Sequence, residues 1–105
     1  MAVTQIKTEE FDGAVGQAPL AMVDFWAVWC GPCQILGPVV EDLAVRYDGK
    51  ALVAKVNVDE SPELAQRFGV MNIPTVVFLK NGREFDRKVG AYPAEVYAGV
   101  LNGAL

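Results

Sequence analysis

The sequence predicts a single α/β domain built on a mixed β-sheet with helices on its faces. Short apolar runs alternate with helical patterns along most of the 105 residues, which is typical of strands separated by crossover helices. Near the C-terminus, two apolar runs are separated by Asn81 and Gly82, a strong hairpin signal. Together these observations predict the order β-α-β-α-β-α-β-β-α and a sheet that is mostly parallel, with one antiparallel hairpin.

The composition is that of one compact domain spanning residues 1–105. Hydrophobic residues make up 52% of the chain and charged residues 21%, which is enough apolar material to form a core without cross-links. The longest apolar stretch, residues 18–29, is interrupted by Asp24 and falls short of the roughly 20 residues of a membrane-spanning helix. We therefore expect no association with a membrane.

Charge and the N-terminal sequence bear on partners and location. The net charge is -4, with acids and bases interspersed, and the absence of a basic patch argues against nucleic acid as a partner. Lys7, Glu9, Glu10 and Asp12 stand where a signal peptide would have a basic head and an apolar core. We expect a cytoplasmic protein, unless a presequence has been removed.

The first half of the chain predicts two buried strands on either side of a helix. A short strand at 3–6 precedes a helix capped by Thr8. Residues 20–27 are almost continuously apolar, as in a central strand buried on both faces, and 51–58 form a second such run. Strand, helix and strand in this order predict a right-handed crossover.

The helix between these strands carries two prolines. Its pattern follows Cys30, Gly31 and Pro32 and runs to about Tyr47. Pro32 fits the first helical turn, where a missing N–H is harmless. Pro38 lies further inside and should kink the helix.

The second half predicts a short helix, a hairpin and a final helix. Ser61 should cap a helix that ends near Gly69. The hairpin strands are expected at 75–79 and 84–89. Pro93 then opens a last amphipathic helix that runs almost to the C-terminus.

Cys30 and Cys33 are the two cysteines of the sequence, and they lie where a buried strand meets the start of a helix. Residues three apart on a helix share a face, so the two sulfurs can approach closely. The free N–H groups and the dipole at a helix start favour a thiolate over a thiol. We expect solvent to reach Cys30, with Cys33 one turn further in and more shielded. This arrangement favours redox exchange.

Two other uses of the cysteine pair are less favoured. A stabilising cross-link over four residues would contribute about 2 kcal/mol, against about 4.7 kcal/mol for a loop of a hundred residues. A zinc site usually needs four ligands, and the chain has neither a histidine nor a third cysteine to complete one. The absence of histidine also excludes a Cys–His hydrolase.

At this point the sequence resembles the thioredoxin family over nearly its whole length. A lone C-x-x-C pair is weak evidence, whereas several matching blocks in order around a Gly-Pro version of the loop are specific. The matching blocks are 23–27, Trp29-Cys30-Gly31-Pro32-Cys33, Pro38, 55–59, 68–70, Ile73-Pro74-Thr75, 80–82 and 89–91.

The resemblance implies both a fold and an activity. It implies a central five-stranded mixed sheet flanked by four helices, and the reduction of disulfides in target proteins by Cys30, which attacks, and Cys33, which resolves. A thioredoxin reductase, commonly a flavoprotein that uses NADPH, would restore the reduced state. This chain itself would bind no cofactor or metal, and we expect it to be a monomer.

Asp24 and Lys55 are charged residues within apolar strands. Burial would raise the pKa of Asp24, and in a chain without histidine this residue is the best candidate general base; alternatively, it reaches solvent at the edge of its strand. The resemblance implies that Asp24 lies behind Cys33, accepts its proton through water, and is paired with Lys55, which tunes its pKa. Otherwise Lys55 would be a surface lysine with a buried stem. Trp26 continues the buried strand and is expected in the core.

Pro74 and the residues around the cysteines would form the target-binding surface. A peptide bond before proline is usually trans, but the resemblance implies a cis bond that faces the cysteines. The backbone of Ile73 would then be free to bond a target peptide as an added strand. Gly90 and Ala91 are small enough to let another backbone come close. The expected apolar rim comprises Trp29, Gly31, Pro32, Ile73, Pro74, Gly90 and Ala91.

The sequence departs from common family patterns at positions that bear on partner preference. Gln34 stands where relatives often carry Lys or Arg, which removes a favourable charge near the thiolate. Val28 replaces a frequent acid. Met71 and Asn72 precede Ile73 where many relatives have a basic or small residue. None of these positions carries the sulfur chemistry.

Two other functions remain open. The first is an oxidase or isomerase on the same fold, which Pro32 disfavours because such relatives often carry histidine in the loop; a reduction potential would distinguish it. The second is a binding or scaffold subunit that uses the same surface without catalysis. Substituting Cys30 by Ser separates this alternative from the enzyme, because a pure scaffold would keep its activity.

Overall fold

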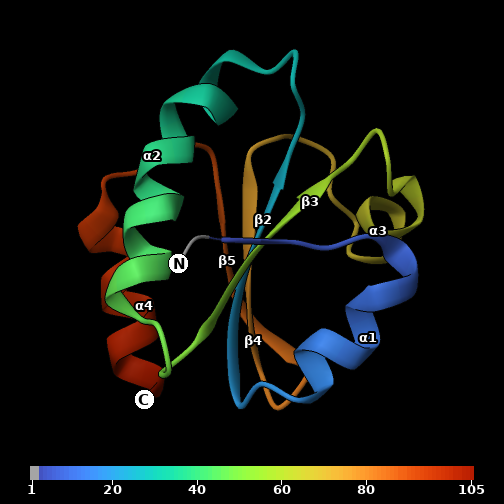
Figure 1. The fold of residues 1–105 in the computed structure, drawn as a ribbon. Coiled ribbons are helices and arrows are strands. Elements are labelled where there is room, and N and C mark those ends of the chain that lie inside the picture. Colours follow the sequence, from blue (N-terminus) through green and yellow to red (C-terminus); the bar gives the residue numbers. More distant parts are fainter. Residues whose placement is uncertain (1–2) are drawn as a thin grey trace.

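The computed structural model describes residues 3–105 and shows a five-stranded mixed sheet with four helices packed against it (Figure 1). Met1 and Ala2 of the expected domain 1–105 lie outside the described residues. The strands, in the spatial order β1-β3-β2-β4-β5, are β1 (Thr4–Gln5), β2 (Leu20–Trp26), β3 (Leu52–Asn57), β4 (Thr75–Lys80) and β5 (Arg83–Val89). The helices are α1 (Thr8–Gly16), α2 (Gly31–Arg46), α3 (Pro62–Arg67) and α4 (Ala94–Ala104). The expected element order is confirmed.

The sheet is mixed, with four strands running in one direction and β4 in the other, which agrees with the predicted fold. Strands β1 and β2 run parallel to β3, whereas β4 is antiparallel to both β2 and β5. The lengths of the connecting helices explain the direction of β4. The 16 residues of α2 span about 24 Å and return the chain to the starting end of the sheet, whereas the 6 residues of α3 span only about 9 Å. Strand β4 therefore starts at the end where β3 finishes.

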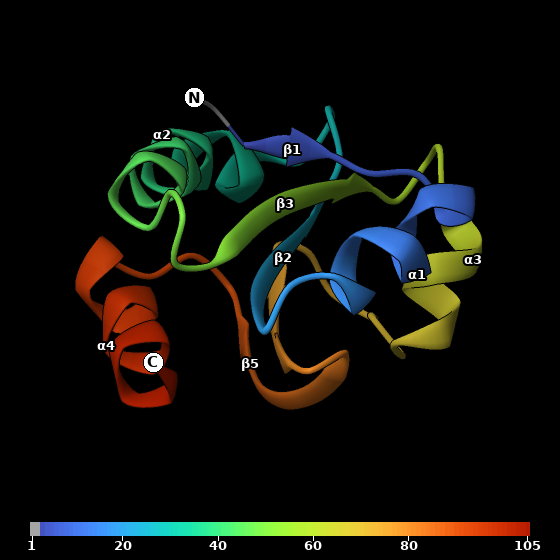
Figure 2. The ribbon, with the colours of Figure 1, turned by 60° about the horizontal axis from the view of Figure 1, so that its bottom comes forward.

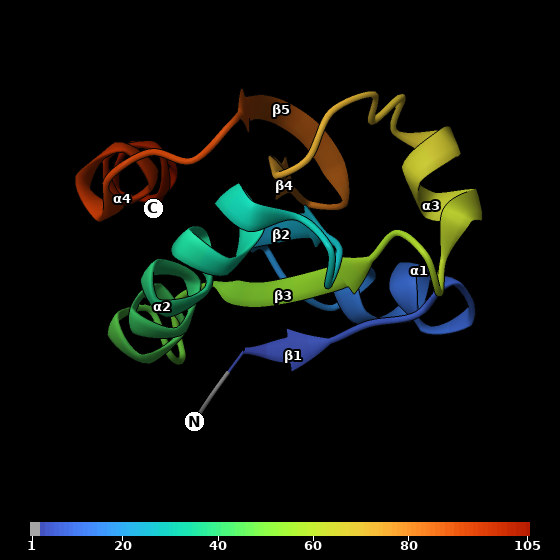
Figure 3. The same cartoon turned by 90° about the horizontal axis from the view of Figure 1, so that it is seen from above.

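The four helices form two layers, one on each face of the sheet. Helices α2 and α4 cover one face, and α1 and α3 cover the other (Figure 2); the end-on view in Figure 3 shows the same separation. Along β2, Leu20 and Met22 pack toward α2 and α4, and Val23 and Phe25 pack toward the opposite layer. Asp24 keeps the register of Leu20 and Met22, so it faces the α2 layer.

The hairpin and the helix starts show how local chemistry sets the element boundaries. Asn81 and Gly82 form the two-residue turn between β4 and β5, both with positive φ (52° and 81°), which confirms the predicted hairpin. The prediction that Thr8 caps α1 is wrong by one residue, because the helix begins at Thr8 and Lys7 is the N-cap. The backbone N–H of Lys7 is bound by the Glu10 carboxylate at 2.9 Å, so Glu10 closes this helix end.

Ser61 stands at the N-cap position of α3, as predicted, but its side chain serves another helix. Its buried hydroxyl accepts a hydrogen bond of 3.1 Å from the backbone N–H of Thr8, the first residue of α1. The contact joins the starts of the two helices that cover this face of the sheet.

Among residues 3–105, no helix is long and apolar enough to span a bilayer.

Candidate active site

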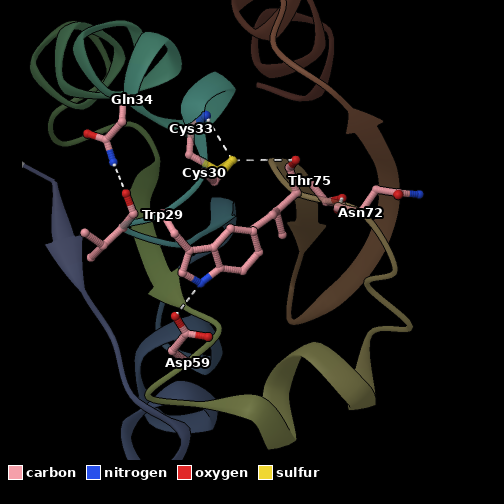
Figure 4. Close-up of a disulfide and its surroundings, with 9 residues drawn as sticks. Trp29, Cys30, Cys33, Gln34, Asp59, Asn72 and Thr75 are labelled. Atoms are coloured by element: carbon pink, nitrogen blue, oxygen red, sulfur yellow. Dashed lines mark hydrogen bonds between the residues drawn. A yellow bond between two sulfur atoms is a disulfide. The ribbon is translucent and has the colours of Figure 1, made fainter.

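Cys30 and Cys33 form a disulfide at the point where β2 gives way to α2, with their Cα atoms 5.3 Å apart. Cys30 is the N-cap residue of α2, and Pro32 lies in the first turn, as predicted. The backbone N–H of Cys33 donates a hydrogen bond of 3.2 Å to Cys30 Sγ (Figure 4). Because a free N–H of the helix start points at this sulfur, the site favours negative charge on Cys30 once the disulfide is reduced.

Both cysteines are buried in the disulfide form, and this differs from the expectation of an open Cys30. The exposed fractions are 5% for Cys30 and 3% for Cys33, so the predicted difference between them is small. They pack with Ala27, and the half-buried side chains of Trp26 and Ile73 contact this cluster. Ile73, which contacts the cysteines, lies far from them in the sequence. The local sequence pattern therefore could not show that Cys30 is buried.

The loop before the disulfide is held by two side-chain hydrogen bonds. The indole N–H of Trp29 donates to the Asp59 carboxylate at 2.8 Å, and the ring itself is 70% exposed (Figure 4). The amide of Gln34 donates to the carbonyl of Val28 at 3.1 Å. Two of the positions that depart from the family pattern, 28 and 34, thus contact each other. Asp59 was not singled out from the sequence, since only the tertiary fold brings it to Trp29.

The segment before β4 lies against the disulfide from the other side. The Ile73–Pro74 peptide bond is cis, which confirms the expectation from the family resemblance. The carbonyl oxygen of Ile73 lies 3.7 Å from Cys30 Sγ, and a disulfide sulfur has no proton to donate, so this is a contact in the oxidised form. The hydroxyl of Thr75 donates to the carbonyl of Asn72 and fixes the preceding turn. Met71, at the start of this turn, is 88% exposed.

The remaining rim residues complete this arrangement. The backbone N–H of Gly90 donates to the carbonyl of Pro74 at 2.8 Å, so the chain after β5 is tied to the cis-proline segment. Gly90 has a φ of 102°, a conformation that favours glycine. Ala91 is exposed beside it, as are Gly31 and Pro32 in the disulfide loop.

Asp24 is fully buried, so the alternative of a carboxylate reaching solvent at a strand edge is wrong. Neither carboxylate oxygen has a hydrogen-bond partner among the described residues. Burial raises the pKa of Asp24 to about 7, because the charged form is poorly solvated there, and the positive charge of Lys55 offsets part of this rise. A carboxyl group with this pKa exchanges its proton near neutral pH.

Lys55 lies opposite Asp24 in the β2–β3 register, and its positive charge lowers the pKa of Asp24, as expected, although the two side chains form no direct ion pair. No hydrogen bond joins the two side chains; instead the Lys55 ammonium lies 4.4 Å from the centroid of the Trp26 ring. A cation over an aromatic face is stabilised by the ring electrons. Trp26 is half-buried between Lys55 and the cysteine cluster rather than fully in the core, and its indole N–H has no partner among residues 3–105.

Tyr97 in α4 is a site residue that the sequence analysis missed. It is fully buried, and its hydroxyl donates to the carbonyl of Gly90 at 3.2 Å and accepts from the N–H of Tyr92 at 3.1 Å. A tyrosine on the apolar face of the last helix was the available signal, because a buried phenol usually needs a polar partner.

Comparison with known proteins agrees with this geometry. The family model for thioredoxin matches residues 2–102. The chain is 46% identical to the thioredoxin of Staphylococcus haemolyticus over 102 residues, which cover 97% of both chains. It is 52% identical to thioredoxin 2 of Chlorobaculum tepidum over 83 residues, 79% of this chain and 76% of that one.

A solved structure gives the same result for the fold. A mutant thioredoxin from Halobacterium salinarum superposes with a TM-score of 0.90 at 34% sequence identity, over 98% of this chain and 90% of the other. The family match, the full-length relatives and the disulfide-bonded C-x-x-C pair agree with one another. The chain therefore belongs to the thioredoxin family and is a dithiol–disulfide oxidoreductase that reduces protein disulfides.

Proposed function

We propose that electrons pass to target proteins by a two-step exchange in which Cys30 attacks and Cys33 resolves. The observation that carries this assignment is the position of the Cys30 sulfur, which is the N-cap of α2 and accepts the N–H of Cys33 at 3.2 Å. The helix start stabilises a thiolate on the first cysteine, and the second cysteine lies within the first turn of the same helix.

In the first step the Cys30 thiolate attacks one sulfur of the target disulfide. The target S–S bond breaks, a bond between Cys30 and the target forms, and the other target sulfur leaves as a thiolate. The exposed Trp29 ring and the small residues Gly31 and Ala91 leave room for the approaching chain. The target backbone docks along Ile73, beside the cis-proline, in the manner of an added strand.

In the second step Cys33 attacks Cys30 and releases the reduced target. The mixed disulfide breaks, the Cys30–Cys33 bond forms, and the second target sulfur leaves as a thiolate, so two electrons have moved to the target. Cys33 loses its proton toward Asp24, which lies on the sheet face that α2 covers and whose pKa of about 7 suits a proton acceptor near neutral pH. Lys55 acts on this step only through its charge.

The reduced state is restored by the reverse exchange with a reductase. Thioredoxins in general act on disulfide-containing proteins and receive electrons from a reductase partner. For this chain we propose a thioredoxin reductase as that partner, a monomeric working form, a cytoplasmic location, and no cofactor or metal of its own. The protein disulfide and the reductase both have to reach Cys30, so they use the same end of the sheet.

Insulin reduction coupled to a thioredoxin reductase and NADPH tests the proposal. The chain should reduce the insulin disulfides, and Cys30→Ser should abolish NADPH consumption, since the variant lacks the attacking sulfur. Alkylation of both thiols of the reduced protein should have the same effect. Insulin reduction that survives in Cys30→Ser would contradict the mechanism, and failure of the unsubstituted protein to reduce insulin would favour a scaffold role.

A further inference from the structure

We propose that Tyr97 is a positioning residue for disulfide exchange, because its buried hydroxyl holds the 90–92 loop in the shape that receives the target backbone. This inference rests on the proposed docking of targets along Ile73 and Gly90. Tyr97 touches neither the sulfurs nor the target, so it acts through the loop. Nothing in the proposed chemistry of Cys30 requires it.

The hydroxyl of Tyr97 makes two hydrogen bonds to the loop, one in each direction. It donates to the carbonyl of Gly90 at 3.2 Å and accepts from the N–H of Tyr92 at 3.1 Å. A phenol has one proton to donate and can accept in return, so both capacities are used on two backbone groups that flank Ala91. The phenol therefore fixes the peptide units on either side of this residue.

The packing of the Tyr97 ring prevents the hydroxyl from moving away. The side chain is fully buried on α4, with the Phe78 ring stacked at 6.3 Å and the Tyr92 ring edge-on at 6.3 Å between centroids. The loop itself is open to solvent at Ala91 and Tyr92. A rigid group below an exposed loop is the arrangement that gives such a loop a single conformation.

A chain of backbone contacts connects this anchor to the disulfide. Gly90 is held on its carbonyl side by Tyr97, and its N–H donates to the carbonyl of Pro74 at 2.8 Å. The preceding carbonyl, that of Ile73, lies 3.7 Å from Cys30 Sγ. Three segments that are distant in the sequence thus meet at one place, and Tyr97 fixes the one of them, the 90–92 loop, that would lie beside a target peptide.

Two variants separate positioning from general stability. Tyr97→Phe keeps the ring and removes the hydroxyl that binds the loop. Tyr47→Phe is the matched control, because the Tyr47 hydroxyl is also buried against α4, where it donates to Asn102 Oδ1 at 2.7 Å. Each change removes one phenol hydroxyl and keeps the ring. The Tyr47 hydroxyl binds α4, whereas the Tyr97 hydroxyl binds the 90–92 loop.

The measurement is the second-order rate constant of the pre-reduced protein with two substrates, insulin and bis(hydroxyethyl) disulfide, in a single turnover. For Tyr97→Phe we expect the insulin rate constant to fall about three- to ten-fold, the equivalent of one or two weakened hydrogen bonds, with no change for the small disulfide. Amide exchange at Tyr92 should become faster in the same variant. Tyr47→Phe should leave all three readouts unchanged.

Each other outcome overturns the inference. An unchanged insulin rate constant in Tyr97→Phe shows that the loop shape does not matter, and an equal loss with both substrates places the effect on the sulfurs. An equal loss in Tyr47→Phe shows that stability alone is responsible. Failure of the proposed function itself looks different, because the unsubstituted protein would then fail to reduce insulin.

Discussion

Asp24 shows most clearly how burial converts an ordinary side chain into one that works near neutral pH. The apolar run around it predicted a buried strand, and the absence of histidine made it the best candidate base. What the sequence did not show is the placement of Lys55, whose ammonium lies over Trp26 instead of bonding the carboxylate. That choice depends on the position of an aromatic ring two residues along β2, which only the three-dimensional arrangement determines.

Asp24→Asn should stabilise the oxidised protein, and the gain should depend on pH. The pKa of Asp24 rises from 3.8 to about 7 on folding, so the folded state holds a proton that the unfolded state loses between these values. The protonated carboxyl of Asp24 thus makes its full contribution to the free energy of unfolding below about pH 4. This contribution is lost as the pH rises toward 7, and the loss is on the order of 4 kcal/mol. The asparagine side chain does not titrate, so the free energy of unfolding of the variant should not fall in this way.

Denaturant unfolding at pH 4 and pH 8 measures the effect of Asp24→Asn. The variant and the parent should differ by a few kcal/mol at the higher pH and much less at the lower one. Asp48→Asn, in the exposed turn after α2, is the control and should change the stability by less than about 0.5 kcal/mol at either pH. A constant difference between parent and Asp24→Asn would show that the carboxyl does not titrate with folding.

Cys33→Ser should stop the cycle after its first step. Cys30 can still attack a target disulfide, but the serine hydroxyl cannot displace it, so a covalent complex should accumulate. Non-reducing electrophoresis of the variant mixed with insulin should show a band that dithiothreitol removes. Normal turnover by this variant would exclude Cys33 as the resolving group.

Helices and strands were predicted where their signals are local. The Asn81–Gly82 turn and the start of α2 depend on residues adjacent in the chain, and both were placed correctly. The sequence did not indicate which hairpin strand runs against the rest of the sheet, because the direction of β4 follows from how far a short helix can carry the chain. The bend expected at Pro38, which lies within α2, stays a prediction.

Ser61→Ala should weaken the junction between α1 and α3. It leaves the N–H of Thr8 without the buried hydroxyl that accepts it, and an unsatisfied buried donor costs about 1–3 kcal/mol. The free energy of unfolding in urea should fall by that amount. Thr8→Ala is the control, since it removes an exposed bond to Glu63 and should cost less than about 1 kcal/mol. Equal losses in the two variants would rule out a special role for Ser61.

Taken as one body, the protein has a core that is separate from its disulfide. Two clusters of buried side chains fill both faces of the sheet between the helix layers, and the cysteines form a small third cluster at one end. This division was predictable in outline from the apolar runs. The burial of Cys30 was not, because it depends on Ile73, which lies 43 residues further along the chain.

Reduction of the disulfide should therefore leave the fold intact. A loop of four residues contributes about 2 kcal/mol to stability, so the free energy of unfolding should fall by about that amount while the transition stays cooperative. Thermal unfolding with and without dithiothreitol measures this. Loss of the cooperative transition on reduction would show that the cross-link, rather than the core, maintains the domain.

The two sulfurs belong to a single turn of α2, and this has a consequence for how the molecule is used repeatedly. Reduction and oxidation of this disulfide should require only a small movement of the two cysteine side chains. The rest of the fold should then stay the same from one reaction cycle to the next. In the proposed mechanism the reductase and the target protein both react at Cys30, so they have to bind in alternation. One molecule can therefore serve a single partner at a time.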